Sequence, residues 1–238
     1  GLSEVKGEFI YFLVSDDWIL KYTVEKCVLT LTENDSDLVI FNAKAFCDDM
    51  PKDMLNSFDY NRKLPSEMYS DGHKLLADSM ASGFYIVQSC CYMYKLSSNL
   101  DLRFIDGILH EDNYFTTMLF LNSSRVSVLT DRFFQRRIRK NSITTGSLSL
   151  KHATGYYKSA ERLSNDLSKQ KIYSKVLTSY YNYLIQSGFN IESEIYNSKV
   201  KFSRKLEIIY NFRKIISYKV CAKVLIPKLY KKILKIVR

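Results

Sequence analysis

The sequence is poor in glycine, proline and histidine, with 8 Gly, 3 Pro and 3 His in 238 residues. This scarcity excludes collagen-like chains and Gly/Pro-rich disordered proteins. No apolar run approaches the ~20 residues that a helix needs to span a bilayer. The length, with 46% hydrophobic and 14% aromatic residues, instead predicts one or two domains with a substantial core.

Cysteine is also sparse, and its pattern lacks any Cys-x-x-Cys pair. The five cysteines are Cys27, Cys47, Cys90, Cys91 and Cys221. Since Cys90 and Cys91 are adjacent, we expect them to point to opposite faces of a strand. The odd number and the spacing disfavour a disulfide scaffold or a zinc site and favour a reducing compartment.

Charge is divided unevenly along the chain. Residues 1–112 carry 10 Lys and Arg against 19 Asp and Glu, a net charge of −9. Residues 113–238 carry 25 against 6, a net charge of +19. The first half suits a metal or another cationic group, and the second half suits an anionic partner such as phosphate, nucleic acid or a lipid surface.

Hydrophobic patterning predicts an α/β fold. Short apolar runs over 8–14 and 37–43 predict strands, and helical spacing over 21–34 lies between them. This order is a βαβ unit, which predicts a mostly parallel sheet with helices on both faces. A polar loop over 47–70 follows, and the further elements that we expect are a helix at 71–82, a strand at 84–94, a helix at 112–122 and a strand at 124–129.

From residue 149 onward the pattern is helical. We expect helices at roughly 149–168, 172–187 and 200–236, with a turn at 188–190. The chain therefore divides into a predicted catalytic domain over 1–148 and a basic helical region over 149–238.

Two adjacent carboxylates, Asp16 and Asp17, follow the first predicted strand. In open α/β sheets ligands bind beyond the carboxyl ends of the strands. A carboxylate pair there can hold a hard divalent cation that grips phosphate oxygens. The alternative is a helix N-cap, which an Asp pair alone would favour.

Three segments, in order, resemble glycosyltransferase family 2. Residues 7–18 (Gly-Glu-Phe-Ile-Tyr-Phe-Leu-Val-Ser-Asp-Asp-Trp) are similar to that family's Gly-Glu-Tyr-Ile-x-Phe-Leu-Asp-Ser-Asp-Asp segment. Residues 102–115 (Leu-Arg-Phe-Ile-Asp-Gly-Ile-Leu-His-Glu-Asp-Asn-Tyr-Phe) resemble its Arg-Phe-x-x-Gly-x-x-x-Glu-Asp-x-x-Phe block. Residues 137–144 resemble its Arg-x-Arg-x-x-Ser segment. Together the three segments are far more specific than each alone.

The resemblance implies a GT-A-like fold and an inverting enzyme of cell-surface polysaccharide synthesis. Such an enzyme moves a sugar from a nucleotide-diphosphate donor to a glycan or lipid-linked oligosaccharide acceptor. It implies Mg²⁺ or Mn²⁺ at Asp16 and Asp17, with Asp16 also facing the donor. It also implies Asp112 as the base that deprotonates the acceptor hydroxyl, and we assign the neighbouring Glu111 to positioning.

The chain departs from the family in two respects. Val14 stands where the family has the first Asp of its Asp-x-Asp motif. The strand, turn and acidic motif with which family members begin do not precede residue 1, so we expect that the N-terminal nucleotide-binding portion is missing.

Physical chemistry alone leaves alternatives at the other candidate residues. Glu111 and Asp112 would also stabilise a helix N-terminus through its dipole. Arg137 and Arg139, on one face of an extended segment beside Arg136, suit diphosphate oxygens, but they also suit a solvated charge run. We expect structural or surface roles for the histidines His73, His110 and His152.

The C-terminal region combines charge with apolar periodicity. Residues 199–238 carry 13 Lys and Arg against Glu207 alone. Apolar residues recur at helical spacing among them, at Ile209, Phe212, Ile216, Val220 and Val224. This predicts a basic amphipathic helix on an anionic membrane surface, and hence a cytoplasmic protein at the inner face of the cell membrane. The alternative is an ordinary helix that packs on the catalytic domain and keeps a charged outer side.

Two other functions compete with sugar transfer. One is a catalytically inactive fragment whose helices bind partners. The other is a basic module that binds anionic surfaces or nucleic acid. Since no RNA- or DNA-binding motif is present and the acidic first half would repel a polyanion, we expect no nucleic-acid partner.

Overall fold

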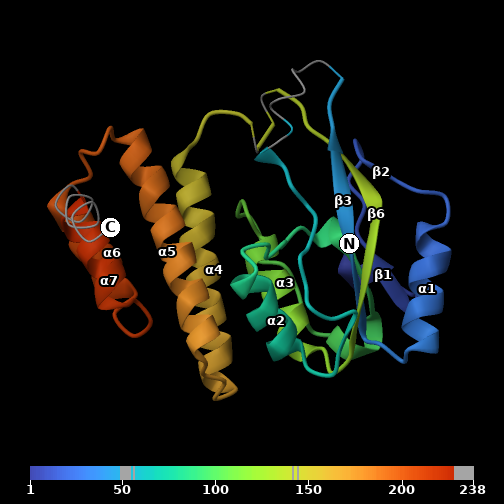
Figure 1. The fold of residues 1–238 in the computed structure, drawn as a ribbon. Helices are drawn as coiled ribbons and strands as arrows, with labels where there is room; N and C mark the ends of the chain where they lie inside the picture. Colours follow the sequence, from blue (N-terminus) through green and yellow to red (C-terminus); the bar gives the residue numbers. More distant parts are fainter. Residues whose placement is uncertain (49–54, 56, 141, 144, 228–238) are drawn as a thin grey trace. The chain divides into compact units, whose positions relative to one another are not determined.

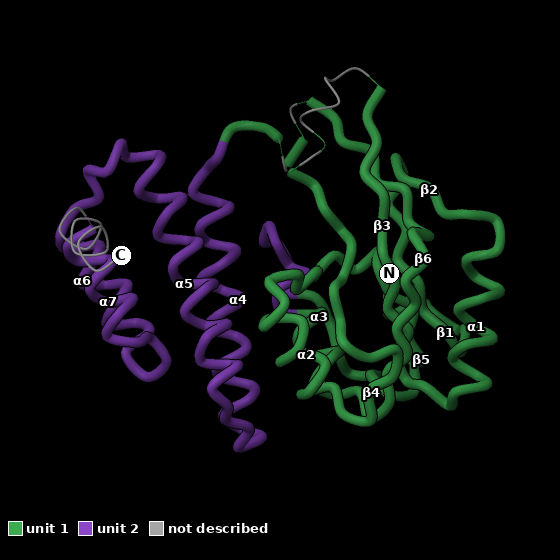
Figure 2. The backbone as a smooth tube through the Cα atoms, viewed as in Figure 1, with its two compact units in different colours: residues 1–104, 115–147 green, residues 105–114, 148–238 purple. Residues whose placement is uncertain are grey.

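The computed structural model describes residues 1–48, 55, 57–140, 142–143 and 145–227. The chain forms two compact units (Figure 2). Unit 1 comprises residues 1–104 and 115–147, and unit 2 comprises residues 105–114 and 148–238. The short segment 105–114 thus belongs with the C-terminal helices, although it lies within the predicted catalytic domain in sequence.

Unit 1 is built on a six-stranded sheet, with the path β1-β5-β3-β6-β2 and β4 paired to β6. The strands are β1 (Phe9–Tyr11), β2 (Trp18–Ile19), β3 (Leu38–Phe46), β4 (Met68–Tyr69), β5 (Tyr92–Lys95) and β6 (Val126–Arg137). The α/β class is confirmed, as is the presence of helices on both faces.

The prediction of a mostly parallel sheet is wrong. Among the described strands only β3 and β6 pair in parallel, and the other pairings are antiparallel. Strands β1 and β3 do run in the same direction, as the βαβ pattern requires, but β5 lies between them and opposes both. The pattern along the chain gave no sign of this inserted strand, because its partners are more than 50 residues distant.

Helices cover both faces of this sheet (Figure 1). On one side, Cys27 and Leu31 of α1 (Thr23–Glu33) share a buried cluster with Phe41 and Phe133. On the other side lie α2 (Gly72–Ala81) and α3 (Asp112–Asn122), with the Phe115 ring of α3 6.3 Å from that of Tyr94. Cover on both faces explains why β3 begins with six consecutive buried residues.

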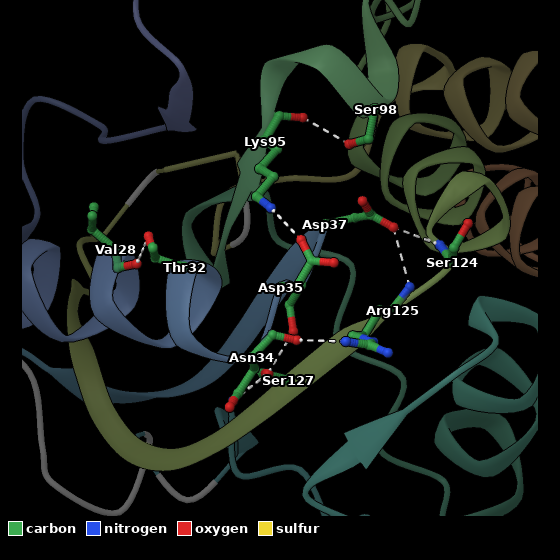
Figure 3. A network of polar contacts seen from close by, with 11 residues as sticks. Val28, Thr32, Asn34, Asp35, Asp37, Lys95, Ser98, Ser124, Arg125 and Ser127 are labelled. Atoms are coloured by element: carbon green, nitrogen blue, oxygen red, sulfur yellow. Dashed lines mark hydrogen bonds and ion pairs between the residues drawn. The ribbon is translucent and has the colours of Figure 1, made fainter.

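Polar contacts tie the turn between α1 and β3 to the start of β6 (Figure 3). The Asp37 carboxylate accepts hydrogen bonds from the backbone N–H groups of Ser124 and Arg125, at 2.8 and 3.1 Å. The Arg125 guanidinium donates to the Asn34 carbonyl oxygen at 3.1 Å. These contacts support the register that places the carboxyl ends of β3 and β6 side by side, with Phe46 opposite Arg137.

Two sequence predictions within unit 1 are wrong in detail. The strand expected at 84–94 forms only at Tyr92–Lys95. Cys90 and Cys91 lie instead in a short 3-10 helix (Ser89–Cys91) and are both buried, so they do not point to opposite faces of a strand. The five cysteines, all within the described residues, form no disulfide bond with one another.

Unit 2 contains helices α4 (Leu150–Lys169), α5 (Lys175–Ile195), α6 (Phe202–Asn211) and α7 (Tyr218–Leu225). The turn expected at 188–190 is absent, because α5 continues through it. A Cβ atom at Gly188 would lie 2.7 Å from the Tyr157 ring, so this glycine serves close helix packing and does not end the helix.

The single helix expected over 200–236 is also wrong. It breaks between Asn211 and Tyr218, where Phe212 and Ser217 flank a turn, and residues 228–238 lie outside the described residues. Three of its predicted apolar residues, Phe212, Val220 and Val224, are buried within the unit. These three residues therefore pack within the helical unit and do not belong to an exposed apolar face, whereas packing on the catalytic domain stays a prediction.

Candidate functional site

The carboxylates Asp16 and Asp17 lie where the chain crosses the end of the sheet. β1 is at one edge of the sheet and β2 is at the other, beside the carboxyl-terminal part of β6. The segment 12–17 joins these edge strands, and a turn closed by the Asp17 N–H and the Val14 carbonyl at 3.1 Å ends it. The crossing takes both carboxylates past the carboxyl ends of β3 and β6, the position expected for a ligand site.

The structure brings all four predicted donor-site residues of this unit together. The Asp16 carboxylate pairs with the Arg139 guanidinium at 2.7 Å. The Asp17 carboxylate accepts a hydrogen bond from the backbone N–H of Arg137 at 2.7 Å. The Arg137 guanidinium itself pairs with Asp48 at 3.0 Å. Both guanidinium side chains stay well exposed, at 40% for Arg137 and 60% for Arg139, so the alternative of a solvated charge run remains compatible with their positions.

Aromatic rings line this charged network. The Arg137 guanidinium lies 5.4 Å from the Phe46 ring centre, and the Trp18 ring lies 6.2 Å from Phe46. Arg136 donates a hydrogen bond to the Tyr60 hydroxyl and stacks on its ring at 5.2 Å. Each cation is thus held in a defined position at the strand ends.

The electrostatics at Asp17 differ from those of an exposed carboxylate. Burial raises the pKa of Asp17 above its ordinary value, and the neighbouring Asp16 adds to the increase, while the hydrogen bond from Arg137 opposes it. A bound cation would favour the ionised form of this carboxylate, because opposite charge nearby lowers a carboxyl pKa.

The carboxylates at the strand ends are too few to hold a metal ion without a bound diphosphate. Within the described residues, no group of three or more His, Cys, Asp or Glu side chains could hold a metal ion. The protein therefore offers an adjacent carboxylate pair, Asp16 and Asp17. Mg²⁺ is typically held by one or two carboxylates plus substrate phosphates and water, so a metal at this pair would need such further ligands.

Glu111 and Asp112 lie in unit 2, at the end of segment 105–114. Asp112 is the first residue of α3, so the helix-dipole alternative remains compatible with its position. Both side chains are partly accessible. The backbone before them turns sharply, because His110 has a left-handed φ of 62° and its carbonyl accepts from the Asn113 N–H at 3.1 Å.

Helices α4 and α5 anchor both flanks of Asp112. The Tyr180 hydroxyl of α5 donates to the Asn113 side-chain oxygen at 2.9 Å, and the Tyr114 hydroxyl donates to Asp166 of α4 at 2.8 Å. On the amino-terminal side, a Cβ atom at Gly155 of α4 would lie 1.9 Å from the Leu109 carbonyl oxygen. The helical unit therefore fixes the segment that carries the candidate base.

The histidines of unit 2 have structural surroundings, as predicted. His152 is buried and caps α4, since its ring nitrogen accepts from the Ser149 N–H at 3.1 Å. The His110 ring lies 5.5 Å from that of His152. Burial, and after it His152, lowers the pKa of His110 below its ordinary value, which keeps the imidazole neutral at neutral pH.

Sequence reasoning missed the residues that hold the base segment. Gly155 gave a usable signal, because an isolated glycine inside a helical pattern often marks close approach of another backbone. Tyr180 and Tyr114 gave none, since their partners are distant in sequence. The buried Arg62 was also missed: it lies in the polar loop and donates to the carbonyl groups of Phe41 and Ile86.

Comparisons with known proteins add independent information. No family model matches the chain. The poly(ribitol-phosphate) beta-N-acetylglucosaminyltransferase TarP of Staphylococcus aureus strain N315 is 26% identical over 232 residues, which cover 91% of this chain and 65% of TarP. The glycosyltransferase GlyA of Streptococcus pneumoniae serotype 4 is 27% identical over 146 residues, covering 60% of this chain and 21% of GlyA.

A solved structure matches the fold. The crystal structure of S. aureus TarS 1–349 in complex with UDP is similar with a TM-score of 0.57 at 17% identity, over 96% of this chain and 62% of that chain. The GT-A-like fold with a helical C-terminal region is thus confirmed, as is the resemblance to glycosyltransferases. This chain spans less than two thirds of the length of TarP, GlyA and this TarS chain. Assignment to family 2 stays a prediction.

Proposed function

We propose that this chain is part of a glycosyltransferase of cell-surface polysaccharide synthesis. It transfers a sugar from a nucleotide-diphosphate donor to a glycan or lipid-linked acceptor by inverting single displacement. The observation that carries the proposal is the network of Asp16, Asp17, Arg137 and Arg139 at the carboxyl ends of the strands. The similarity to TarP and GlyA supports it.

The network suits a diphosphate because it already alternates negative and positive charge. Arg137 and Arg139 bind the diphosphate oxygens and offset the charge that develops on the leaving group. The Asp16 carboxylate pairs with Arg139 in this structure, and it would be available to hold a cation when Arg139 binds the diphosphate. A Mg²⁺ or Mn²⁺ ion at Asp16 and Asp17 would supply further positive charge at the diphosphate.

Asp112 acts on the acceptor. Its carboxylate takes the proton from the acceptor hydroxyl, and the oxygen attacks the anomeric carbon on the side opposite the diphosphate. The bond from that carbon to the phosphate oxygen breaks, and the nucleoside diphosphate leaves with the bonding electrons. One displacement of this kind inverts the anomeric configuration. Glu111 positions the acceptor beside Asp112.

Replacing Asp16 by alanine is expected to weaken Mn²⁺-dependent binding of UDP by at least about tenfold, because one of two metal-binding carboxylates is lost. Titration calorimetry with UDP, with and without Mn²⁺, measures the effect in the protein translated from its whole reading frame. Asp35→Ala is the matched control, since Asp35 is an exposed carboxylate that pairs with Lys95. Equal UDP affinity in Asp16→Ala and the parent would remove the metal role.

Replacing Val14 by aspartate is expected to tighten Mn²⁺-dependent UDP binding, because it restores the carboxylate that the resembled family carries at this position. The exposed side chain of Val14 leaves room for the change. Leu13→Asp, at an equally exposed neighbouring position, controls for added negative charge. If both variants bind Mn²⁺ and UDP alike, charge alone is responsible and the alignment of Val14 with the motif is wrong.

We further propose that the basic C-terminal region contacts an anionic membrane surface at the cytoplasmic face. No helix in the described part of the chain is both long enough and apolar enough to cross a membrane. On α6 the exposed residues Phe202, Leu206 and Tyr210 recur every four residues, and therefore share one face. Lys201 is the N-cap residue of this helix, and each basic residue near an anionic surface contributes about 1 kcal/mol.

The double variant Phe202→Ser/Tyr210→Ser is expected to lose most of its sedimentation with phosphatidylglycerol-containing vesicles. Tyr173→Ser, an exposed tyrosine in the turn before α5, should sediment like the parent. High salt should weaken sedimentation of the parent, because it screens the basic residues. Equal sedimentation of the double variant and the parent would show that the α6 face does not bind membranes.

A further inference from the structure

Unit 2 contains an aromatic cluster that the proposed mechanism does not use. It is formed by His110 of the base segment, Tyr156 of α4, and Tyr180 and Tyr183 of α5. The ring centres of His110 and Tyr156 lie 4.5 Å apart. Those of Tyr156 and Tyr183 lie 6.5 Å apart at nearly right angles, and Tyr180 and Tyr183 are stacked at 6.0 Å.

The aromatic rings of the cluster range from fully buried to exposed. Tyr180 is only 1% exposed, and its hydroxyl donates a hydrogen bond to the Asn113 side chain. Burial and this hydrogen bond give Tyr180 a structural role. Tyr183 is 53% exposed, so packing alone does not account for its ring. Tyr156 lies between these extremes. Burial, and then the neighbouring Tyr183, raises the pKa of Tyr156 to about 12, so its hydroxyl stays protonated as a hydrogen-bond donor.

The cluster also lies beside the candidate base along the chain. His110, whose ring contacts Tyr156, is two residues before Asp112, and the hydrogen bond between the His110 carbonyl and the Asn113 N–H closes a tight turn around them. The His110 ring thus links the cluster to the short segment that carries Asp112.

We propose that Tyr156 and Tyr183 form an acceptor subsite that stacks against a sugar or polyol chain. Sugars and polyols present apolar C–H faces and hydroxyl edges, which match an aromatic face that carries a polar phenol group. The subsite orients the acceptor so that one hydroxyl points to Asp112. The inference rests on the proposed function, because it assigns the acceptor side of the same reaction.

The test measures carbohydrate binding directly, without sugar transfer. Saturation-transfer NMR with two probes, ribitol and methyl β-N-acetylglucosaminide, gives their Kd for the parent and for three variants. Tyr183→Ala removes the ring, and Tyr183→Phe keeps the ring without the hydroxyl. Tyr173→Ala removes an exposed tyrosine outside the cluster and is the matched control. Circular dichroism checks that each variant is folded.

We expect Tyr183→Ala to raise the Kd of at least one probe about threefold to tenfold, while Tyr183→Phe retains most of the affinity and Tyr173→Ala is unchanged. Equal affinity in Tyr183→Ala and the parent would overturn the subsite, and so would the absence of binding of both probes to the parent. UDP binding is measured on the same samples, so that failure of the acceptor subsite can be told apart from failure of the proposed function. If the parent does not bind UDP, the donor site alone is contradicted.

Discussion

Replacing Asp112 by asparagine is expected to lower the rate of sugar transfer about 10²–10⁴-fold, the usual contribution of general-base catalysis. The acceptor hydroxyl is a poor nucleophile until a base takes its proton, and an asparagine of the same shape cannot take it. Donor binding should persist, because Asp16, Asp17, Arg137 and Arg139 belong to unit 1 and are unchanged. Steady-state kinetics with separate donor titrations measures both effects.

The neighbouring carboxylate provides the control. Glu111→Gln removes a negative charge at the adjacent position and should have a milder effect, since Glu111 is assigned to positioning. Transfer by Asp112→Asn at the parent rate would show that Asp112 serves only as the first-turn carboxylate of α3. A loss of donor binding together with transfer would instead indicate a general change in structure.

Replacing Gly155 by alanine is expected to lower both stability and transfer, although alanine is intrinsically the better helix former by about 1 kcal/mol. The new Cβ atom would lie 1.9 Å from the Leu109 carbonyl oxygen, and a backbone atom cannot rotate away as a side chain does. Overpacking of this kind costs about 1–3 kcal/mol or more. We expect the melting temperature to fall by roughly 2–12 °C.

The effect on transfer distinguishes this variant from ordinary destabilisation. Displacement of Leu109 shifts the segment that carries Asp112, so transfer should fall even at temperatures where the variant remains folded, while UDP binding is retained. Gly188→Ala makes the same change within α5 and should be milder, because its nearest neighbour is the Tyr157 side chain at 2.7 Å and the nearest backbone atom, the Ala153 carbonyl oxygen, is at 3.1 Å. If the two variants lose equal activity, α4 does not position the base segment.

The local elements of the fold were largely predictable from the sequence. The helix expected at 112–122 forms at Asp112–Asn122, the apolar run at 8–14 contains β1, and the run at 37–43 covers the first part of β3. Periodicity and short-range capping determine such elements, so they are visible in a window of ten to twenty residues. The resemblance to a known family singled out Asp16, Asp17, Arg137 and Arg139, whereas the contacts between them join residues about 120 positions apart and were not visible in such a window.

The pairing order and the break in the last helix were not predictable. The insertion of β5 between β1 and β3 depends on contacts between residues far apart in sequence, such as Ile40 with Tyr92. The turn after Asn211 contains no glycine or proline, and tertiary contacts of Phe212 and Ser217 establish it. The association of segment 105–114 with the C-terminal helices was missed likewise, since Tyr180 contacts Asn113 across 67 residues.

Detection of the glycosidic product is the most direct test of the proposed function. The protein translated from its whole reading frame is incubated with UDP-GlcNAc, the donor bound in a similar TarS structure, Mn²⁺ and a ribitol-phosphate oligomer, and proton NMR follows the anomeric signals with time. The account predicts release of UDP and growth of a β-linked product from the α-linked donor, both lost in Asp112→Asn. An α-linked product would contradict single displacement, and the absence of UDP release and product with this and the other common nucleotide sugars would contradict the assignment as a glycosyltransferase.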